Sequence, residues 1–321
     1  ESKLTSIQES GFESDKSTYN ENLFEWQRDI VHWALRKGKA CLFEDCGLGK
    51  TLQQLSFAEE VFKHTGGDVL ILAPLAVASQ TKSEGAKFGI EVNICRKQCD
   101  VKRGINITNY EMIEHFEPET FQGIILDESS ILKNSTGATK TALTEMFKNT
   151  PYKLCCTATP APNDFMEIGN HAEFLGIMSQ TEMLATYFVH DGKNTSKWRL
   201  KGHAKAKFFE WIASWACCMT SPADLGYDSG EYKLPPLIIH EIQVESGNTQ
   251  AEDGQLMFYA ETAESLSERR EARKESLEKR VEKSKEIAES VDGQALIWCD
   301  YNDESALLAA EIAESVEVKG A

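Results

Sequence analysis

The sequence predicts an α/β fold in which helices cover both faces of a parallel sheet, followed by the start of a second unit of the same kind. Up to about residue 170, short continuous apolar runs alternate with helical patterns. Strands without polar alternation are typical of a parallel sheet that is buried on both faces. The alternation breaks over 171–240 and resumes at 295–298, where a fresh apolar run precedes a helical pattern at 304–315.

Each element is predicted from its own pattern. Apolar residues recur at helical spacing over 23–36, and a second helix is expected over 52–62, after a glycine-containing loop. Buried strands are expected at 40–43, 69–72, 105–108, 123–126 and 153–156. Later in the chain the patterns predict helices around 174–177, 183–188 and 208–217, and an alternating strand over 237–244.

These patterns divide the chain into parts. We expect a flexible N-terminal lead-in over 1–22, a first lobe over 23–170, a helical elaboration and linker over 171–250, a charged connecting helix over 251–291 and a truncated second lobe over 292–321. The chain opens with Glu1 rather than Met and closes soon after the last unit has begun. We therefore expect a piece of a longer protein or a processed chain.

The composition excludes several classes of protein. The 321 residues are 41% hydrophobic and 26% charged, which is typical of a soluble globular protein rather than a disordered one. No apolar run approaches the roughly 18 residues of a membrane helix, and no signal-peptide pattern is present. The nine cysteines form no CxxC pair, so neither a disulfide framework nor a zinc ribbon is indicated. We expect a cytoplasmic protein, because such thiols suit a reducing compartment.

A phosphate-binding loop is predicted between the strand at 40–43 and the helix at 52–62. The loop reads Gly47, Leu48, Gly49, Lys50 and Thr51. Backbone N–H groups of such a loop, together with the helix N-terminus, cradle nucleotide phosphates. The lysine would pair with the β- and γ-phosphates, and the threonine hydroxyl would ligate Mg²⁺. The usual first glycine of this motif is replaced by Glu44.

Two carboxylates follow the predicted strand at 123–126. Asp127 is placed to hold Mg²⁺ through water, and Glu128 to orient and deprotonate an attacking water. A surface strand end is the alternative, since such pairs are common there. The phosphate loop upstream favours the hydrolytic interpretation.

Residues 127–134 resemble the DEAHRIKN motif of the Snf-type DNA translocases of helicase superfamily two. The residues in register with that motif are Asp127, Glu128, Lys133 and Asn134. Ser129 and Ser130 replace its Ala-His pair. Further blocks resemble the family in its order: 23–27, 44–51, 71–75, 108–111, 156–160, 234–236 and 295–298. The positions at which this sequence differs from the family motifs resemble the compact translocases of phages and prophages.

This resemblance implies a RecA-like lobe with a helical insertion and the beginning of a second RecA-like lobe. It implies an ATP-dependent DNA translocase or helicase that uses ATP and Mg²⁺. Such a protein would move along DNA without reading base sequence, and duplex DNA is the expected form. Gln27 would read adenine, while Thr157 and Thr159 would relay the nucleotide state to DNA. Lys133 and Asn134 would contact DNA, and an arginine finger is expected after Ala321.

Two alternatives remain open. A strand-separating helicase would use the same residues. An ATP-switched protein-interaction module, or the motor subunit of a larger nuclease or defence assembly, fits the acidic composition better, because Asp and Glu outnumber Lys and Arg by 51 to 34 and the net charge is −17.

A basic segment stands out against this acidity, since residues 192–209 contain no Asp or Glu. Lysines recur in it at every fourth position: Lys193, Lys197, Lys201 and Lys205. If the segment is helical, these side chains share one stripe. The stripe would contact DNA phosphates or would form an ordinary solvated face.

Overall fold

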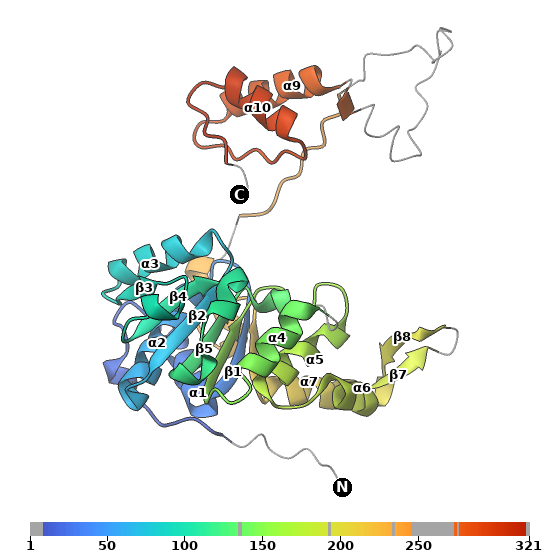
Figure 1. The fold of residues 1–321 in the computed structure, drawn as a ribbon. Coiled ribbons are helices and arrows are strands. Elements are labelled where there is room, and N and C mark those ends of the chain that lie inside the picture. Colours follow the sequence, from blue (N-terminus) through green and yellow to red (C-terminus); the bar gives the residue numbers. More distant parts are fainter. Residues whose placement is uncertain are drawn as a thin grey trace. The chain divides into compact units, whose positions relative to one another are not determined.

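The computed structural model describes residues 9–133, 137–191, 194–232, 235–244, 273–274 and 276–318. The chain divides into two compact units, Glu1–Leu234 and Pro235–Ala321 (Figure 1).

The first unit is built on a seven-stranded parallel sheet with the strand order β3-β4-β2-β5-β6-β1-β9. The strands are β1 (Lys39–Glu44), β2 (Asp68–Ala73), β3 (Val92–Ile94), β4 (Ile105–Asn109), β5 (Phe121–Asp127), β6 (Tyr152–Cys156) and β9 (Ala216–Met219). All five strands predicted for this unit are confirmed.

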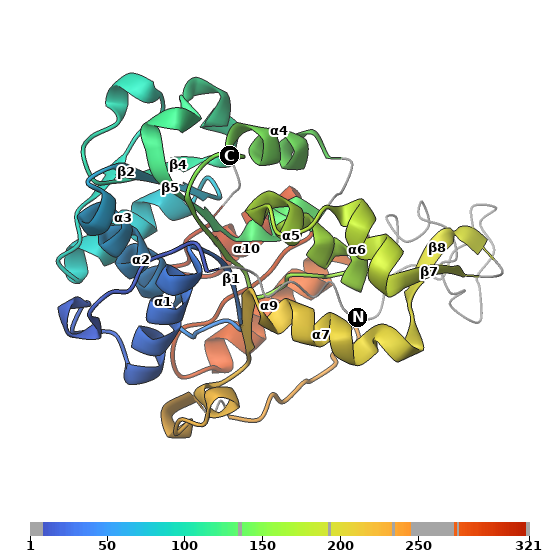
Figure 2. The same cartoon turned by 90° about the horizontal axis from the view of Figure 1, so that it is seen from below.

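Helices cover both faces of this sheet (Figures 1 and 2). In β2, Val69 and Ile71 pack into one apolar cluster, while Leu70 and Leu72 pack into the other, because successive side chains of a strand point to opposite faces. The first cluster is completed by α1 (Glu25–Lys37), α2 (Lys50–Thr65) and α3 (Val77–Lys87). The second is completed by α4 (Ala138–Met146), α5 (Ile168–Leu175), α6 (Gln180–Tyr187) and α7 (Lys205–Ala213).

Short 3-10 helices connect many of these elements. They are η1 (Lys16–Thr18), η2 (Gln98–Asp100), η3 (Tyr110–His115), η4 (Pro118–Thr120), η5 (Ser129–Lys133), η6 (Phe165–Glu167), η7 (Gly202–Ala204), η8 (Pro222–Leu225) and η9 (Gly230–Tyr232). Across the described ranges, no helix combines the length and apolar composition that a membrane span requires.

Two strands of the sheet were not predicted. β3 has only three residues, and β9 overlaps the end of the helix expected over 208–217. That helix stops at Ala213, and Trp215 instead accepts a hydrogen bond from Cys41 N at 3.0 Å as the chain joins β1. The local apolar pattern fits either structure, and pairing with a distant strand decides between them. The first unit therefore extends well beyond residue 170.

The basic segment is not a helical stripe, which corrects the helical interpretation. It forms an antiparallel hairpin of β7 (Phe188–Asp191) and β8 (Asn194–Leu200), which projects beyond α6 (Figures 1 and 2). The lysines are distributed accordingly: Lys197 lies in β8, Lys201 follows it, Lys205 begins α7, and Lys193 lies outside the described residues. Cross-strand pairs such as His190 with Trp198 stabilise the hairpin over the helix.

The lead-in is anchored from Ser10 onwards, in contrast to the expected flexible segment. The N–H groups of Ser10, Gly11 and Phe12 donate to the carbonyl oxygens of the last turn of α1, at 3.1–3.3 Å. The last carbonyls of a helix lack partners within it, and the lead-in supplies donors to these three, although Leu35 O also accepts from Gly38 N at 3.2 Å. Tyr19 is buried further along the same segment.

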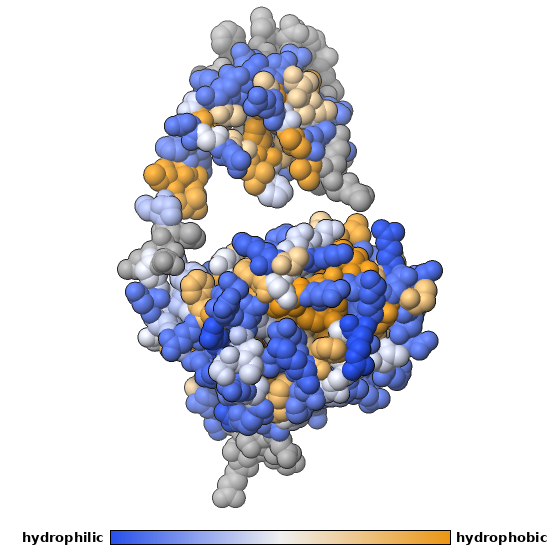
Figure 3. Space-filling model, turned by 90° about the vertical axis from the view of Figure 1, so that its left-hand side faces the viewer, coloured by the Kyte–Doolittle hydropathy of each residue, from blue (hydrophilic) through white to orange (hydrophobic). Residues whose placement is uncertain are grey.

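The second unit contains α9 (Leu277–Ser290) and α10 (Asn302–Glu311), which pack together and are linked by the ion pair Arg280–Glu304 at 3.0 Å. Residues 251–272 of the expected charged helix lie outside the described residues. The strands expected at 237–244 and 295–298 are not formed in the described part of this unit. Leu296 and Trp298 are 79% and 88% exposed, and apolar side chains lie on the surface (Figure 3). A strand needs a neighbour to pair with, so a second RecA-like lobe stays a prediction.

We expect Gly11→Ala to destabilise the first unit by about 1–3 kcal/mol, the usual cost of forced overpacking. A Cβ at this position would overlap the Leu35 carbonyl oxygen, and the backbone cannot withdraw without breaking the bond to Arg36. Urea unfolding measures the change. Gly202→Ala is the matched control, because a Cβ there meets nothing within 4 Å. Equal stability of the two variants would contradict the anchoring role.

Candidate functional site

The glycine-containing loop between β1 and α2 has a conformation that requires its glycines. Gly47 and Gly49 have φ angles of +83° and +73°, in the region that L side chains rarely adopt. Leu48 between them is buried. A Cβ at Gly49 would also lie 2.6 Å from Gln27 Nε2. The backbone conformation of Gly47 and Gly49 and the close packing of Gln27 against Gly49 therefore fix the shape of the loop.

Lys50 stands at the start of α2, where it spans this loop. Its Nζ donates to the carbonyl oxygens of Glu44 at 2.8 Å and Asp45 at 2.9 Å. Gly49 is the N-cap of this 16-residue helix, and because glycine has no side chain, it cannot cap the first N–H groups of the helix. Unsatisfied N–H groups of the first helical turn attract anions, and the ammonium group adds positive charge beside them.

Gln27 lies directly against the loop, from α1. Its Oε1 accepts a hydrogen bond from Phe24 N at 2.9 Å, and its Nε2 donates to Leu48 O at 2.9 Å. The side chain is almost fully buried. The structure therefore places Gln27 beside the predicted phosphate loop, and its reading of adenine stays a prediction.

Asp127 ends β5 and is fixed by two neighbours. Its Oδ1 accepts from Gln54 Nε2 at 2.7 Å, and its carbonyl oxygen accepts from Tyr110 Oη at 2.6 Å. Burial raises the pKa of the Asp127 carboxyl, while the bond from Gln54 and the charge of Lys50 act in the opposite direction. This carboxylate thus faces the phosphate loop in a partly desolvated setting.

Glu128 has an exposed side chain and a φ angle of +50°. A non-glycine residue in this region is uncommon and costs energy, and such outliers concentrate at functional sites. The residue after it is tied down, since Ser129 is fully buried with its Oγ 3.1 Å from His171 Nε2. Burial lowers the pKa of His171 to about 4, so the imidazole is neutral at pH 7.

A third loop lies between these two, because β6 stands between β5 and β1 in the sheet. Thr157 follows β6, is fully buried and donates its N–H to Leu42 O at 3.1 Å. Its Oγ1 accepts from Thr159 N at 3.1 Å. The predicted coupling residues therefore connect the strand of the phosphate loop to the neighbouring loop.

The predicted DNA contacts lie outside these three loops. Lys133 is exposed at the end of η5, and its carbonyl oxygen accepts from Asn170 Nδ2 at 3.1 Å. Lys201 Nζ donates to Ala185 O and Thr186 O at 2.8 and 3.0 Å, at the end of α6. Asn134 and Lys193 lie outside the described residues.

Glu44 stands where the usual motif has glycine, and it is completely buried. Its Oε2 accepts from Gln53 Nε2 at 2.8 Å, while its Oε1 has no partner among the described residues. Burial raises the pKa of the Glu44 carboxyl to about 7. The Glu44 carboxyl is therefore about half-protonated at neutral pH. Glu44 is the last residue of β1, the strand that leads into the phosphate loop.

The donor set suits a magnesium-bound nucleotide but not a metal held by protein alone. Thr51 and Asp127 offer a hydroxyl and a carboxylate, the hard oxygen ligands that Mg²⁺ prefers. No group of three or more His, Cys, Asp or Glu side chains in the described ranges could hold a metal ion. Mg²⁺ at this place would therefore complete its octahedron with phosphate oxygens and water.

Sequence reasoning missed the residues that position the site: Gln53, Gln54, Tyr110 and His171. Gln54 carried a usable signal, because it stands four residues after Lys50 and so lies on the same face of the helix. The contacts of Tyr110 and His171 join elements far apart in the chain, and no local pattern indicates them.

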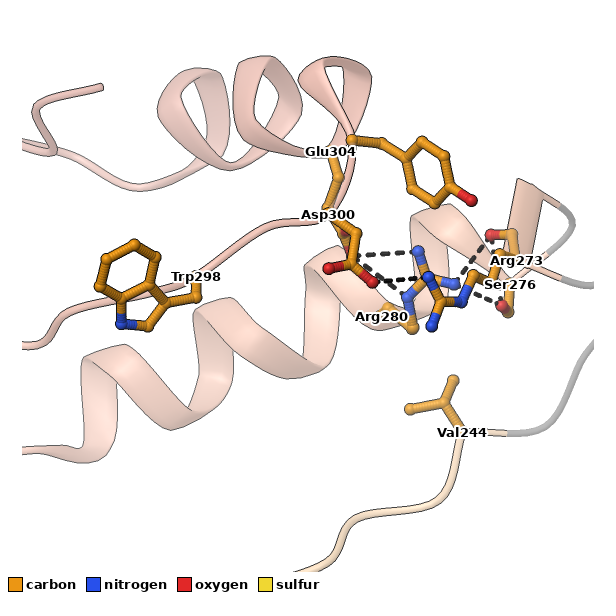
Figure 4. A pocket seen from close by; sticks show the side chains of 8 residues that line it. Val244, Arg273, Ser276, Arg280, Trp298, Asp300 and Glu304 are labelled. Carbon is orange, nitrogen blue, oxygen red and sulfur yellow. Dashed lines mark hydrogen bonds and ion pairs between the residues drawn. The ribbon is translucent and has the colours of Figure 1, made fainter. Parts of the chain in front are cut away.

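A separate pocket of about 490 Å³ lies in the second unit (Figure 4). Its charged side chains are already paired, Arg273 with Asp300 at 2.5 Å and Arg280 with Glu304 at 3.0 Å. Trp298 points away from these pairs. The pocket thus offers a ligand no uncompensated charge, and the edge of the parallel sheet is the stronger candidate site.

Comparison with known proteins identifies relatives of the first unit. The sequence profile of the SNF2-related domain matches residues 26–188, just over half of the chain. A SWI/SNF-related matrix-associated actin-dependent regulator of chromatin subfamily A-like protein 1 from Xenopus tropicalis is 29% identical over 156 residues, 45% of this chain and 16% of that protein. The DNA annealing helicase and endonuclease ZRANB3 of Mus musculus is 27% identical over 157 residues, 43% and 14% respectively. This chain thus spans about a sixth of the length of these relatives.

Solved structures show the same fold. The SWI2/SNF2 ATPase core of Sulfolobus solfataricus in complex with dsDNA matches with a TM-score of 0.54 at 21% identity, over 64% of this chain and 46% of that one. The same core domain in a second structure gives 0.53 at 20% identity, over 71% and 50%. The α/β lobe of the first unit is therefore RecA-like.

We expect the free energy of unfolding to fall as the pH rises from about 4.5 to about 7, because the folded protein keeps the Glu44 proton that the unfolded chain releases. The decrease is up to about 3 kcal/mol. Glu44→Gln should remove it, so that the variant matches the parent at pH 5 and exceeds it at pH 8 in urea unfolding. Glu91→Gln, at an exposed position, should keep the parent's pH dependence. The same dependence in both variants would contradict the assignment.

Proposed function

The chain belongs to the family of SNF2-related domains, and on that premise we propose that it binds and hydrolyses ATP to drive movement along duplex DNA without reading base sequence. One observation carries the proposal. The strand order β5-β6-β1 brings Asp127 and Glu128, the Thr157 loop and the phosphate loop to the same edge of the sheet.

Lys50 and Thr51 bind the nucleotide in this proposal. The ammonium group leaves the carbonyl oxygens of Glu44 and Asp45 and pairs with the β- and γ-phosphates, since a charged acceptor binds it more strongly. Thr51 and Asp127 would hold Mg²⁺, which neutralises charge on the phosphates when bound. Gln27, beside the loop, recognises the adenine base.

Glu128 acts as the general base. Its left-handed backbone turns the side chain out into solvent at the end of β5, next to Asp127. From there the carboxylate orients a water for in-line attack on the γ-phosphate and accepts its proton. The bonds to Gln54 and Tyr110 and the burial of Ser129 hold this turn in place.

Thr157 and Thr159 couple the nucleotide to DNA. The Thr157 N–H is bonded to Leu42 in the strand that leads to the phosphate loop, so a shift of that loop alters the loop after β6. A duplex partner is supported by the Sulfolobus solfataricus core, whose structure contains dsDNA. Lys133 and Asn134 are the proposed contacts within the first lobe.

A second candidate function is an ATP-switched module that binds proteins, as the motor subunit of a larger assembly. The net charge of −17 favours it, because an acidic surface repels DNA except at local basic sites. Stimulation of hydrolysis by DNA separates the two functions.

We expect Glu128→Gln in the full-length protein to leave ATP affinity nearly unchanged and to remove most hydrolysis, since this side chain contacts water rather than nucleotide. Lys50→Ala should instead weaken binding of ATP itself. Titration with a fluorescent ATP analogue and steady-state phosphate release measure the two effects. An equal decrease in affinity in both variants, with turnover preserved in Glu128→Gln, would contradict these roles.

We expect random-sequence duplex DNA to raise the ATPase rate of the full-length protein severalfold, with little difference between AT-rich and GC-rich duplexes. Contacts confined to phosphates carry no sequence information. Phosphate release is measured at saturating ATP with each duplex. A rate that no DNA changes would favour the protein-binding module, and a rate that depends on one sequence would contradict the lack of base readout.

A further inference from the structure

The hairpin β7–β8 is a part of the first unit that the ATP site does not explain. It is a two-stranded ribbon outside the seven-stranded sheet, and it projects beyond α6 (Figure 2). An isolated two-stranded hairpin is only marginally stable, so a protein that keeps one must fix its base. Here the base is fixed by Lys201, whose N–H donates to Tyr187 O at 2.9 Å and whose Nζ binds the end of α6.

The two faces of this ribbon differ. On one face, Phe188 is buried and Trp198 and Leu200 pack against the second apolar cluster. On the other, Val189 stands opposite Arg199, and both are exposed. The ribbon thus has an inner apolar face and an outer face that presents a cation to solvent.

The segment that continues the ribbon carries cations where a helix disfavours them. Lys205 and Lys207 lie in the first turn of α7, both exposed, and that turn holds no acidic residue. Positive charge at a helix N-terminus opposes the helix dipole, whereas an anion bound there is stabilised. Residues 192–209 contain six Lys or Arg residues and no acidic one, in a chain of net charge −17.

We propose that β7, β8 and the first turn of α7, here called the basic ribbon (188–191 and 194–207), form an arm that lies along a groove of duplex DNA and contacts its phosphates through Arg199, Lys205 and Lys207. This proposal rests on the proposed function and adds a contact surface to it. The major groove of B-DNA admits a two-stranded β-ribbon.

The sequence of the hairpin tip favours a groove over a junction between single and double strands. The residues between the strands and beside them read Asp191, Gly192, Lys193, Asn194 and Thr195. A strand-separating pin replaces base stacking with an apolar or aromatic wedge, and this stretch of sequence contains no large apolar or aromatic residue. The aromatic residue of β8, Trp198, lies against His190 across the ribbon, with the two ring centroids 3.7 Å apart.

The test compares two variants in which the same number of positive charges is removed from the full chain. Arg199→Ala with Lys205→Ala removes one arginine and one lysine from the basic ribbon. Lys102→Ala with Arg103→Ala removes the same charges from an exposed position before β4, at the opposite edge of the sheet from the ATP site. Fluorescence anisotropy with a labelled random-sequence 30-base-pair duplex is recorded over a series of KCl concentrations.

We expect the ribbon variant to bind the duplex more weakly, with a slope of log affinity against log salt that is smaller by up to about 2, or about 0.9 for each phosphate that the variant no longer neutralises. The control variant should keep the parent's slope, and both should bind a fluorescent ATP analogue as the parent does. An unchanged slope in the ribbon variant, with the parent binding duplex, overturns the basic ribbon alone.

Two further outcomes are decisive. If the ribbon variant binds duplex normally but no longer prefers forked DNA as the parent does, the hairpin is a strand-separating pin and the groove contact is wrong. If the parent neither binds duplex nor hydrolyses ATP faster in its presence, the proposed function fails together with the ribbon.

Discussion

The parallel register of β5, β6 and β1 is the constraint on which the candidate site depends. Asp127 pairs with Cys156, and Cys156 pairs with Leu42 on its other side, so β5 and β6 end level and β1 continues two residues further, to Glu44. Because parallel strands release their chains at the same edge, three loops from distant parts of the sequence meet there. A slip of one register position would separate the carboxylates from the phosphate loop and would turn the buried side chains of these strands to the wrong face.

Burial is the second influence on this edge, and it acts on Glu44 and Asp127 in the same direction. It raises the pKa of both Glu44 and Asp127, and the opposing effects come from Gln53 at the first, Gln54 at the second and the charge of Lys50 at both. The turn that carries Glu128 is held instead by Tyr110 and by the buried Ser129. Polar side chains of α2 thus set the electrostatics of the site, and two of them, Gln53 and Gln54, lie outside the motif to which Lys50 belongs.

Local patterns sufficed for much of this molecule. The five inner strands and the phosphate loop were predicted because continuous apolar runs and Gly49-Lys50-Thr51 carry their signal within a few residues. The rest depends on partners remote in the chain. The sequence of β9 fits the end of a helix, and only its pairing with β1 makes it a strand. The spacing of the lysines suits a helix, yet cross-strand pairing makes this segment a hairpin. Residues 10–12 have no pattern that indicates α1 as their partner. The site roles of Gln27, Thr157 and Thr159 remain predictions from a resemblance.

The two hydrogen bonds of Lys50 determine which molecules the loop can accept. Its ammonium group is already satisfied by the carbonyl oxygens of Glu44 and Asp45. A ligand that binds Lys50 must replace both of these hydrogen bonds. A ligand with a neutral acceptor therefore gains no binding energy from the replacement. An ionised phosphate does gain, because its negative charge adds a direct Coulomb attraction to the ammonium group that a neutral carbonyl oxygen lacks. The loop therefore selects ligands first by their negative charge. A nucleoside without phosphate gains no binding energy from Lys50, whatever the fit of its base and sugar.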